Sequence, residues 1–396
     1  MLEWLNTVSK NIIVFLPIQL NTSLNIIIGA GFSQPAGLPV GTAIQERFDG
    51  SLREKFYELS SSEWGWTDGR DISRRTGVEY QFILEEIVNE YKIAKNGFID
   101  YEDFYQYVID NIGVKGWYET ISRSAKPRYY SAFNLREEDD NYGYAFRNPQ
   151  SQRPKEIINH LIADLLSVLK NGNELKQIYG PFIRFLQKYK SVNIFSLNHD
   201  LLLEKLFTLF NLKFCDGFSS NDSCLTYKEG LLPIFISAFS SEPINLVKLH
   251  GSIDMYLFEH CNESGSMLTR TGEISYFKPG GHYEKHYTQR IDPKSRNVVQ
   301  HFNPNIVPQF ITGNNKREII KSDYMYSEMY NLYKREISSN ADLLIIGYSY
   351  RDKHINEELE KFSSTQGPQV INLNKRETFP FKTPRITEIN SFSLLV

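Results

Sequence analysis

The sequence predicts an α/β protein whose core is a doubly wound, mostly parallel sheet. Short apolar runs recur along the 396 residues, most end in a glycine-rich or polar turn, and several precede amphipathic helical segments. Apolar runs of this length are typical of strands buried on both faces of a parallel sheet. Strands that alternate with helices indicate a parallel sheet covered by helices on both sides, the Rossmann-like arrangement.

Five segments have this strand character and are the predicted strands of the sheet, in the order in which they occur along the chain. They are residues 24–28, 191–197, 244–249, 342–346 and 369–373. Helical patterns follow two of them, at 200–210 and 352–362, and Asp352 is placed to cap the second of these helices.

The residues between the predicted strands indicate two insertions. Residues 51–185 have mainly helical patterns, with apolar positions repeated on one face along 78–93 and 157–169, so we expect a helical insertion subdomain. Residues from about 256 to 340 are expected to form an irregular insertion. The Rossmann-like domain is then expected to comprise residues 1–50 and 186–396.

Charge and composition exclude several classes of protein. The formal net charge of −3 argues against broad nucleic-acid binding. The apolar runs are shorter than the roughly 18–20 residues of a membrane span, and the run at 12–18 lacks a signal-peptide cleavage site, so we expect a cytoplasmic protein.

No metal site is expected from the pattern of possible ligands. Cys215, Cys224 and Cys261 do not form the paired spacing of a four-cysteine zinc site. His282 and His286 have an i, i+4 spacing, but they follow two glycines and belong to no HExxH pattern.

Glycine and polar residues follow the predicted strands at one edge of the sheet. They are Gly29, Ala30, Gly31, Phe32 and Ser33 after the first strand, Asn198 and Asp200 after the second, His250 after the third, Gly347 and Ser349 after the fourth, and Asn372 in the fifth. Because the carboxyl ends of parallel strands share one edge, we expect these residues to converge on a ligand crevice. Glycines in the first turn let the backbone approach a pyrophosphate, although the third glycine of GxGxxG is replaced by Gln34.

These motifs, in this order, resemble the sirtuin family. The matching pieces are Gly29-Ala30-Gly31-Phe32-Ser33 with Ala36-Gly37-Leu38-Pro39, then Asn198-His199-Asp200, Leu249-His250-Gly251, Gly347-Tyr348-Ser349 and Ile371-Asn372. The stretch from Gly347 to Asn356 is similar to the divergent sirtuin-like domains of bacterial antiphage systems, such as the sirtuin-like subunit of a HerA-associated system. Those domains hydrolyse NAD⁺.

The resemblance implies a role for each motif. Residues 29–33 would hold the phosphates of NAD⁺, Asn198 and Asp200 would contact the nicotinamide ribose, the carboxamide and the attacking water, and His250 would be the general base. Gly347 and Ser349 would contact phosphate or ribose, and Asn372 the adenosine ribose. Structural alternatives stay open: His250 as a buried structural histidine, Asn198 or Asp200 as a helix cap, and His199 and His354 without a role in the site.

The expected activity is NAD⁺ glycohydrolysis, with NAD⁺ as substrate and nicotinamide and ADP-ribose as products. Two departures from deacylating sirtuins favour hydrolysis: the zinc-binding cysteines are absent, and Val40-Gly41-Thr42 replaces the Asp-Phe-Arg of the cofactor loop. The alternatives are an NAD-dependent protein deacylase and a non-catalytic subunit that senses NAD or ADP-ribose.

An enzyme that depletes a shared cofactor has to be kept inactive until its activity is needed. Residues 51–185 and 256–340 are expected to supply oligomer contacts or a gate over the site, and we expect a homo-oligomer. The resemblance further implies abortive-infection antiphage defence, controlled by a HerA-like ATPase, an Argonaute-like protein or a phage component.

Overall fold

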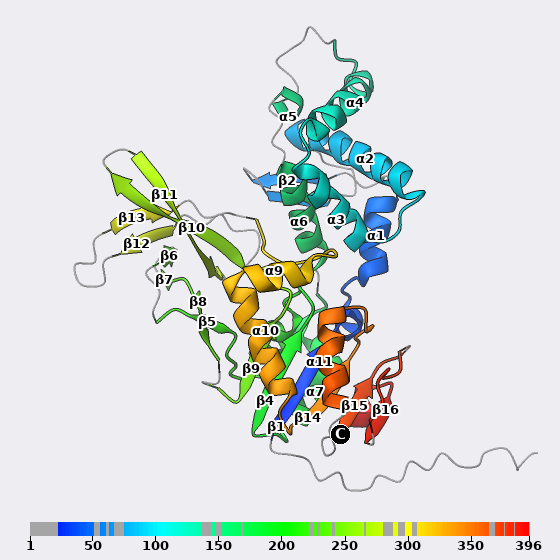
Figure 1. Ribbon diagram of the computed structural model, residues 1–396, viewed down its shortest axis with the longest axis vertical. Helices are drawn as coiled ribbons and strands as arrows, with labels where there is room; N and C mark the ends of the chain where they lie inside the picture. The colour runs from blue at the N-terminus through cyan, green and yellow to red at the C-terminus, as the bar shows by residue number, and fades with distance from the viewer. Residues whose placement is uncertain are drawn as a thin grey trace, which may run out of the picture.

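The computed structural model describes most of the chain, and its centre is a six-stranded parallel sheet (Figure 1). The strand order is β16-β15-β14-β1-β4-β9. The described residues are 23–50, 56–60, 63–66, 75–136, 144–147, 152–167, 169–221, 225–227, 230–239, 242–264, 267–279, 288–291, 298–302, 307–363, 369–375, 377–383 and 385–395. The strands are β1 (Ser23–Ile28), β4 (Ser191–Ser196), β9 (Ile244–Lys248), β14 (Asp342–Ile346), β15 (Val370–Leu373) and β16 (Ile386–Ile389).

The structure confirms the predicted α/β class and contains all five predicted strands. β1 pairs in parallel with both β14 and β4, so the chain turns to one side of β1 first and returns to its other side after β9. The sixth strand, β16, was not predicted, because only alternate residues of this edge strand are partly buried and its sequence lacks a continuous apolar run.

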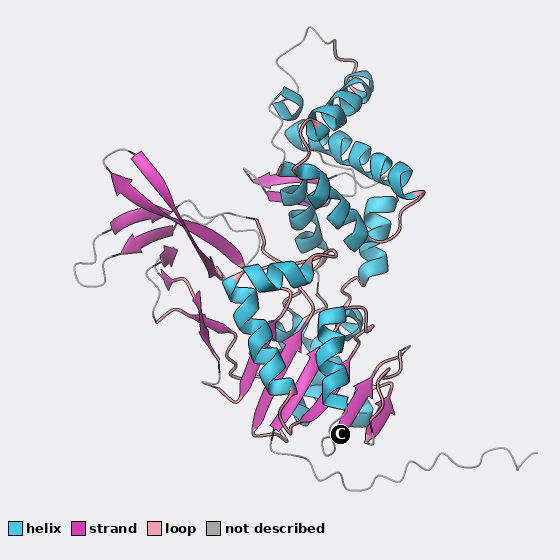
Figure 2. Ribbon diagram, viewed as in Figure 1, coloured by secondary structure: helices cyan, strands magenta, loops and turns pink. Residues whose placement is uncertain are grey.

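Helices cover both faces of the sheet (Figure 2). Leu24, Ile26 and Ile28 of β1 belong to a core shared with α7 (Gly172–Leu186) and α8 (Leu202–Leu209). Ile27 points to the opposite core, shared with α10 (Tyr324–Ile337) and α11 (Lys353–Ser363). This alternation follows from the two-residue repeat of a strand and explains why both Ile27 and its neighbours Ile26 and Ile28 are apolar.

Three buried asparagines form a ladder across the middle of the sheet. Asn25, Asn193 and Asn245 lie at the same level of β1, β4 and β9. Asn193 donates from Nδ2 to Asn25 Oδ1 over 3.1 Å, and Asn245 donates to Asn193 Oδ1 over 2.9 Å. A shift of β1 or β9 relative to β4 would break these hydrogen bonds between buried amides, so the ladder specifies the register of the three strands.

A helical region with its own core stands beyond the carboxyl edge of the sheet, at the top of Figure 1. It contains α1 (Gly41–Asp49), the hairpin β2 (Phe56–Ser60) and β3 (Glu63–Trp66), α2 (Arg75–Lys95), α3 (Tyr101–Ile112), α4 (Trp117–Ala132), α5 (Tyr144–Arg147) and α6 (Arg153–Leu165). α7 falls within the expected helical insertion, yet it packs on the sheet, because its apolar face is buried against β1 and β4.

Much of the segment expected to be irregular, about 256–340, has regular structure instead. β10 (Tyr256–Ser264) and β11 (Met267–Phe277) form a hairpin that extends into a sheet with β8 (Ile234–Ala238) and β5 (Gly217–Ser219). A second sheet joins β13 (Val298–Phe302), β12 (Thr288–Ile291), β6 (Leu225–Tyr227) and β7 (Gly230–Leu231). α9 (Lys316–Ser322) and α10 follow. The strands were missed because charged and polar residues interrupt their apolar positions.

Candidate functional site

The turns that follow β1, β4, β9 and β14 meet at the carboxyl edge of the sheet. β1 lies between β14 and β4, where the strand order reverses, and open α/β sheets bind their ligands in the crevice at such a switch point. This edge faces the helical region, and the segment 307–316 passes between them. All of the predicted site residues except Asn372 of β15 therefore come from the ends of four neighbouring strands of the sheet.

The glycines after β1 lie against the turn after β14. Gly29 N donates to Ile346 O over 2.9 Å, and Gly31 N donates to Gly347 O over 3.0 Å. A Cβ atom at Gly29 would lie 2.6 Å from Gly347 O, and one at Gly31 would lie 2.8 Å from Gly347 Cα. Gly347 itself has a φ of +60°. These glycines are thus required by the close approach of two backbone turns, whatever ligand the turns hold.

The rest of the first turn is also held within the protein. Phe32 and Ser33 donate their backbone N–H groups to Gly29 O and Ala30 O. The Phe32 side chain is buried and packs against the rings of Tyr179 and Phe182. The phosphate-binding role of residues 29–33 stays a prediction.

Ser33, Asn198 and Asp200 form one buried hydrogen-bond network. Ser33 Oγ donates to Asp200 Oδ2 over 2.7 Å. Asn198 Nδ2 lies 3.0 Å from both Ser33 Oγ and Gly29 O and donates to them. Asp200 Oδ1 accepts from Leu202 N, the first residue of α8, over 3.0 Å, while the N-cap position itself is Leu201. The network joins the ends of β1 and β4 and ties Asp200 to the start of α8.

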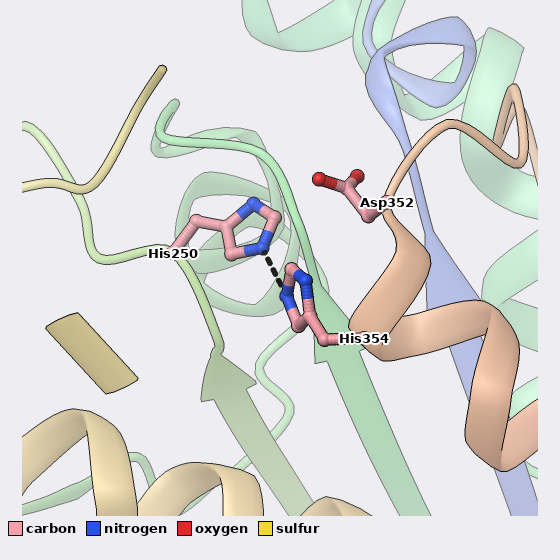
Figure 3. A group of neighbouring side chains, drawn as sticks. All are labelled: His250, Asp352 and His354. Carbon is pink, nitrogen blue, oxygen red and sulfur yellow. Dashed lines mark hydrogen bonds between the residues drawn. The ribbon is translucent and has the colours of Figure 1, made fainter. Parts of the chain in front are cut away.

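His250 follows β9 and faces a second histidine. Its Nε2 lies 3.1 Å from Nε2 of His354 at the start of α11, and Asp352 lies beside both rings (Figure 3). Gly251, which follows His250 in the turn, has a φ of +77°, a conformation that favours glycine. There is also no space for a side chain, because a Cβ there would lie 2.6 Å from Tyr326 Oη. His354, which the sequence leaves open as a structural residue, therefore lies in direct contact with His250.

Burial and neighbouring charges set the protonation of this group. Burial lowers the pKa of His250 well below its ordinary value and lowers that of His354 to about 4. Burial alone would raise the pKa of Asp352, but His250 and Lys316 lower it to about 2. At neutral pH the two imidazoles are neutral, so each has a lone pair, and the carboxylate is charged.

Lys316, the first residue of α9, connects this group to the helical region. Its Nζ lies 2.8 Å from Asp352 Oδ1 and 3.1 Å from Glu102 Oε1 of α3. Burial would lower the pKa of Lys316, but these two carboxylates raise it above its ordinary value. Lys316 therefore remains charged in a buried position between two parts of the molecule.

Other contacts hold the segment 307–316 to the helical region. Gln106 Oε1 accepts from Asn314 N over 3.0 Å and from Asn315 N over 3.3 Å. Asn159 Nδ2 donates to Pro308 O over 3.0 Å. Phe310 belongs to the core of the helical region and stacks on His199, with ring centroids 4.6 Å apart. The helical region thus contacts the residue next to Asn198.

Part of the predicted site is buried. Ser33, Asn198, Asp200 and His250 are each at most 9% exposed, whereas Ala30, Gly31 and Ser349 are exposed. A cavity of about 330 Å³ is lined by residues outside the predicted set: Leu166, Ser167, Leu169, Leu201, Glu204, Lys205, Thr208 and Ile253. Access of a substrate to His250 therefore requires movement of the segments that cover this residue.

Two further predicted cofactor residues differ in their burial. Asn372 is fully buried in β15; its Nδ2 donates to Glu388 Oε2 over 2.6 Å, and its Oδ1 accepts from Tyr350 Oη over 2.8 Å. Ser349 is exposed in the turn after β14. Tyr348 is buried and packs in the core. His282 and His286 lie outside the described residues.

The sequence analysis missed four residues of the site: Glu102, Lys316, Asp352 and His354. The only local signal is the pair Asp352 and His354, which begins the helix after the fourth predicted strand, at the edge where ligand residues gather. Nothing in the sequence places Glu102 or Lys316 beside this pair, because both come from the predicted insertions.

Comparison with known families identifies the domain. Residues 192–379 match the family model of the SIR2-like domain. The match includes Asn198, His250 and Gly347, while the glycine turn after β1 precedes it. No curated protein matches the chain. Among the described residues, no helix is both long enough and apolar enough to cross a membrane. Residues 192–379 are thus similar to the SIR2-like domain, a type of domain that implies NAD⁺ binding.

Proposed function

We propose that this protein is an NAD⁺ glycohydrolase that converts NAD⁺ to nicotinamide and ADP-ribose. The observation that carries the proposal is the position of His250, a buried neutral imidazole at the carboxyl end of β9 within the SIR2-like match. The Asn198, Ser33 and Asp200 network at the neighbouring strand ends supports it. Binding alone would not need a proton acceptor at this place.

The reaction requires one proton acceptor and an oriented water. The water oxygen attacks C1′ of the nicotinamide ribose, and the bond from C1′ to the nicotinamide nitrogen breaks. Its electron pair stays on that nitrogen, so nicotinamide leaves as a neutral molecule without needing an acid. His250 accepts the proton of the water, while the amide of Asn198 orients water or ribose. General-base catalysis of this kind contributes about 10²- to 10⁴-fold.

Hydrolysis is favoured over deacylation by two features of the chain. The three cysteines do not supply the four-cysteine zinc module that shapes an acyl-peptide cleft in sirtuins. The segment after Pro39 is Val40-Gly41-Thr42, and it enters α1 directly. The Asp-Phe-Arg loop, which would shield the reactive face of the ribose from water, is therefore missing at this position.

We propose further that the arrangement with His250 buried is a resting state released by a partner or by oligomerisation during antiphage defence. The burial of His250 and the contacts of the helical region with Lys316 and with residues 314–315 support such a restraint. The resemblance implies the candidate partners: a HerA-like ATPase, an Argonaute-like protein or a phage component.

The product profile tests the proposed activity. The full chain, alone and with the products of its neighbouring genes, is incubated with NAD⁺ and an acylated peptide, and nicotinamide, ADP-ribose and acyl-ADP-ribose are separated by chromatography. We expect free ADP-ribose, lost by about 10²-fold or more in His250→Ala and reduced in Asn198→Ala. Asn173→Ala, an exposed asparagine on α7, is the matched control and should retain full turnover.

Other outcomes would contradict the proposal. Acyl-ADP-ribose as the main product would identify a deacylase. Tight binding of NAD⁺ without turnover under every activating condition would identify a sensor subunit.

A further inference from the structure

His250, Asp352 and His354 present three metal-ligand atoms to one point. A nitrogen from each ring and a carboxylate oxygen all lie within 4.8 Å of one another. The two Nε2 atoms are 3.1 Å apart. Figure 3 shows the rings approaching from the turn after β9 and from the start of α11, with the carboxylate of Asp352 on the side of the helix entry. Two elements of the fold therefore converge on this group.

The donor set and its spacing suit a divalent transition metal. Two imidazole nitrogens with one carboxylate oxygen are the ligands of many open zinc sites. Zinc–nitrogen bonds of about 2.0–2.1 Å at a tetrahedral angle hold two nitrogens about 3.3 Å apart, close to the observed separation. A direct hydrogen bond between two neutral rings uses one lone pair, whereas a metal ion binds the lone pairs of both.

The surroundings hold the ligands in place. Lys316 Nζ donates to Asp352 Oδ1, which leaves Oδ2 for a metal ion. Glu102 balances the charge of Lys316. The backbone of His354 is held by Tyr330 Oη, which donates to His354 O over 2.7 Å, and Asp352 N donates to Tyr348 Oη over 3.2 Å. Metal sites depend on such outer contacts, because these orient the ligands before the ion arrives.

We propose that His250, His354 and Asp352 bind one divalent transition-metal ion, with Zn²⁺ as the ion of best fit, and that this form of the protein is inactive. Each ring then carries its proton on Nδ1 and binds the ion through Nε2. The second half of the proposal rests on the proposed function: His250 cannot accept a proton from water while its lone pair is bound to a metal. The ion would thus act as a brake at the general base.

The binding half is tested without any measurement of activity. The full chain is treated with EDTA, dialysed and titrated with ZnCl₂ by calorimetry, and Co²⁺ is added separately to record the visible spectrum of a tetrahedral site. We expect one high-affinity Zn²⁺ per chain and a rise in Tm with Zn²⁺. His354→Gln and Asp352→Asn should weaken binding by about 100-fold or more, beyond the 10- to 100-fold loss typical of changes to outer contacts.

His199→Gln is the matched control. His199 is buried, and its ring centroid lies 6.5 Å from that of His250, but it belongs to no ligand set. It should bind Zn²⁺ as the unchanged chain does. Equal binding by His354→Gln, or no binding by the unchanged chain, would overturn the proposed site. Unfolding curves without metal show whether each variant is folded.

The inhibitory half has its own readout. Zn²⁺ should suppress NAD⁺ hydrolysis in the unchanged chain, and EDTA should restore it. Whatever rate of hydrolysis His354→Gln retains should be the same with and without Zn²⁺. Faster hydrolysis with Zn²⁺ would overturn this half. A chain that binds Zn²⁺ but hydrolyses no NAD⁺ would refute the proposed function alone, and one that hydrolyses NAD⁺ but binds no Zn²⁺ would refute the metal site alone.

Discussion

Lys316 Nζ lies 2.8 Å from Asp352 Oδ1, so the first residue of α9 forms an ion pair with the histidine group. The same Nζ lies 3.1 Å from Glu102 of α3. A movement of the helical region therefore changes the charge beside His250 and His354. These ion pairs are contacts through which the helical region could hold the site inactive, and mutations can test them.

Loosening the helical region should raise basal NAD⁺ hydrolysis. Gln106→Ala removes the acceptor for the backbone N–H groups of Asn314 and Asn315. Loss of such bonds costs about 1–3 kcal/mol, so the open population should rise about 5- to 150-fold. Nicotinamide release by the chain alone measures the effect. Gln187→Ala, at an exposed position after α7, is the control. An unchanged or lower rate in Gln106→Ala would argue against this restraint.

Ser33→Ala should lower both stability and turnover. The substitution leaves Asp200 Oδ2 without its buried donor, at a cost of about 1–3 kcal/mol in the free energy of unfolding. It also removes one partner of Asn198, so NAD⁺ turnover should fall by at least about 10-fold. Urea denaturation and product analysis measure the two effects. Ser338→Ala, whose hydroxyl makes an exposed bond to Lys334 O, should change stability by less than about 0.5 kcal/mol. Equal stability of the two variants would refute the network's importance.

Gly347→Ala should destabilise the junction between the turns after β1 and β14. The added Cβ would lie 2.3 Å from Phe32 N, at a φ of +60° that side chains other than glycine rarely adopt. Overpacking and backbone strain together cost about 2–5 kcal/mol. Gly113→Ala is the matched control, because its Cβ meets no atom within 4 Å and its φ is −81°. A Tm for Gly347→Ala equal to that of the control would contradict the close packing of the two turns.

His199 should make stability depend on pH. Burial, followed by Lys316 and Lys248, lowers its pKa from 6.5 to about 3, although the Gly251 backbone and Asp352 oppose the shift. Above pH 6.5 His199 is neutral in both the folded and the unfolded chain, so it imposes no penalty on folding. Below pH 6.5 only the unfolded chain binds the proton, so the free energy of unfolding falls as the pH decreases from 6.5 toward 3, by about 1.4 kcal/mol for each pH unit.

His199→Phe tests this dependence, because the new ring can stack on Phe310 as the imidazole does. The difference in unfolding free energy between the two chains, measured by urea titration from pH 7 to pH 4, isolates the contribution of His199. We expect the variant to become more stable relative to the unchanged chain as the pH falls. Parallel pH profiles would contradict the depressed pKa.

The sequence alone determined the sheet and the strand ends where ligand residues gather. Parallel strands buried on both faces are continuous apolar runs, so β1, β4, β9, β14 and β15 were readable without tertiary information. The edge strand β16 and the β-rich sheets lacked this signal, because their residues alternate between polar and apolar or carry charge. Local patterns also placed His250 and Asn198 at the ends of strands.

Only the tertiary structure decided which residues surround His250. His250 and His354 are 104 positions apart, and Glu102 meets Lys316 from 214 positions away, distances over which no local periodicity operates. The fold likewise showed that Gly29, Gly31 and Gly347 serve the contact between two turns. Burial set the protonation of the histidines, because the desolvation of a charge depends on everything packed around it, from whatever part of the chain it comes.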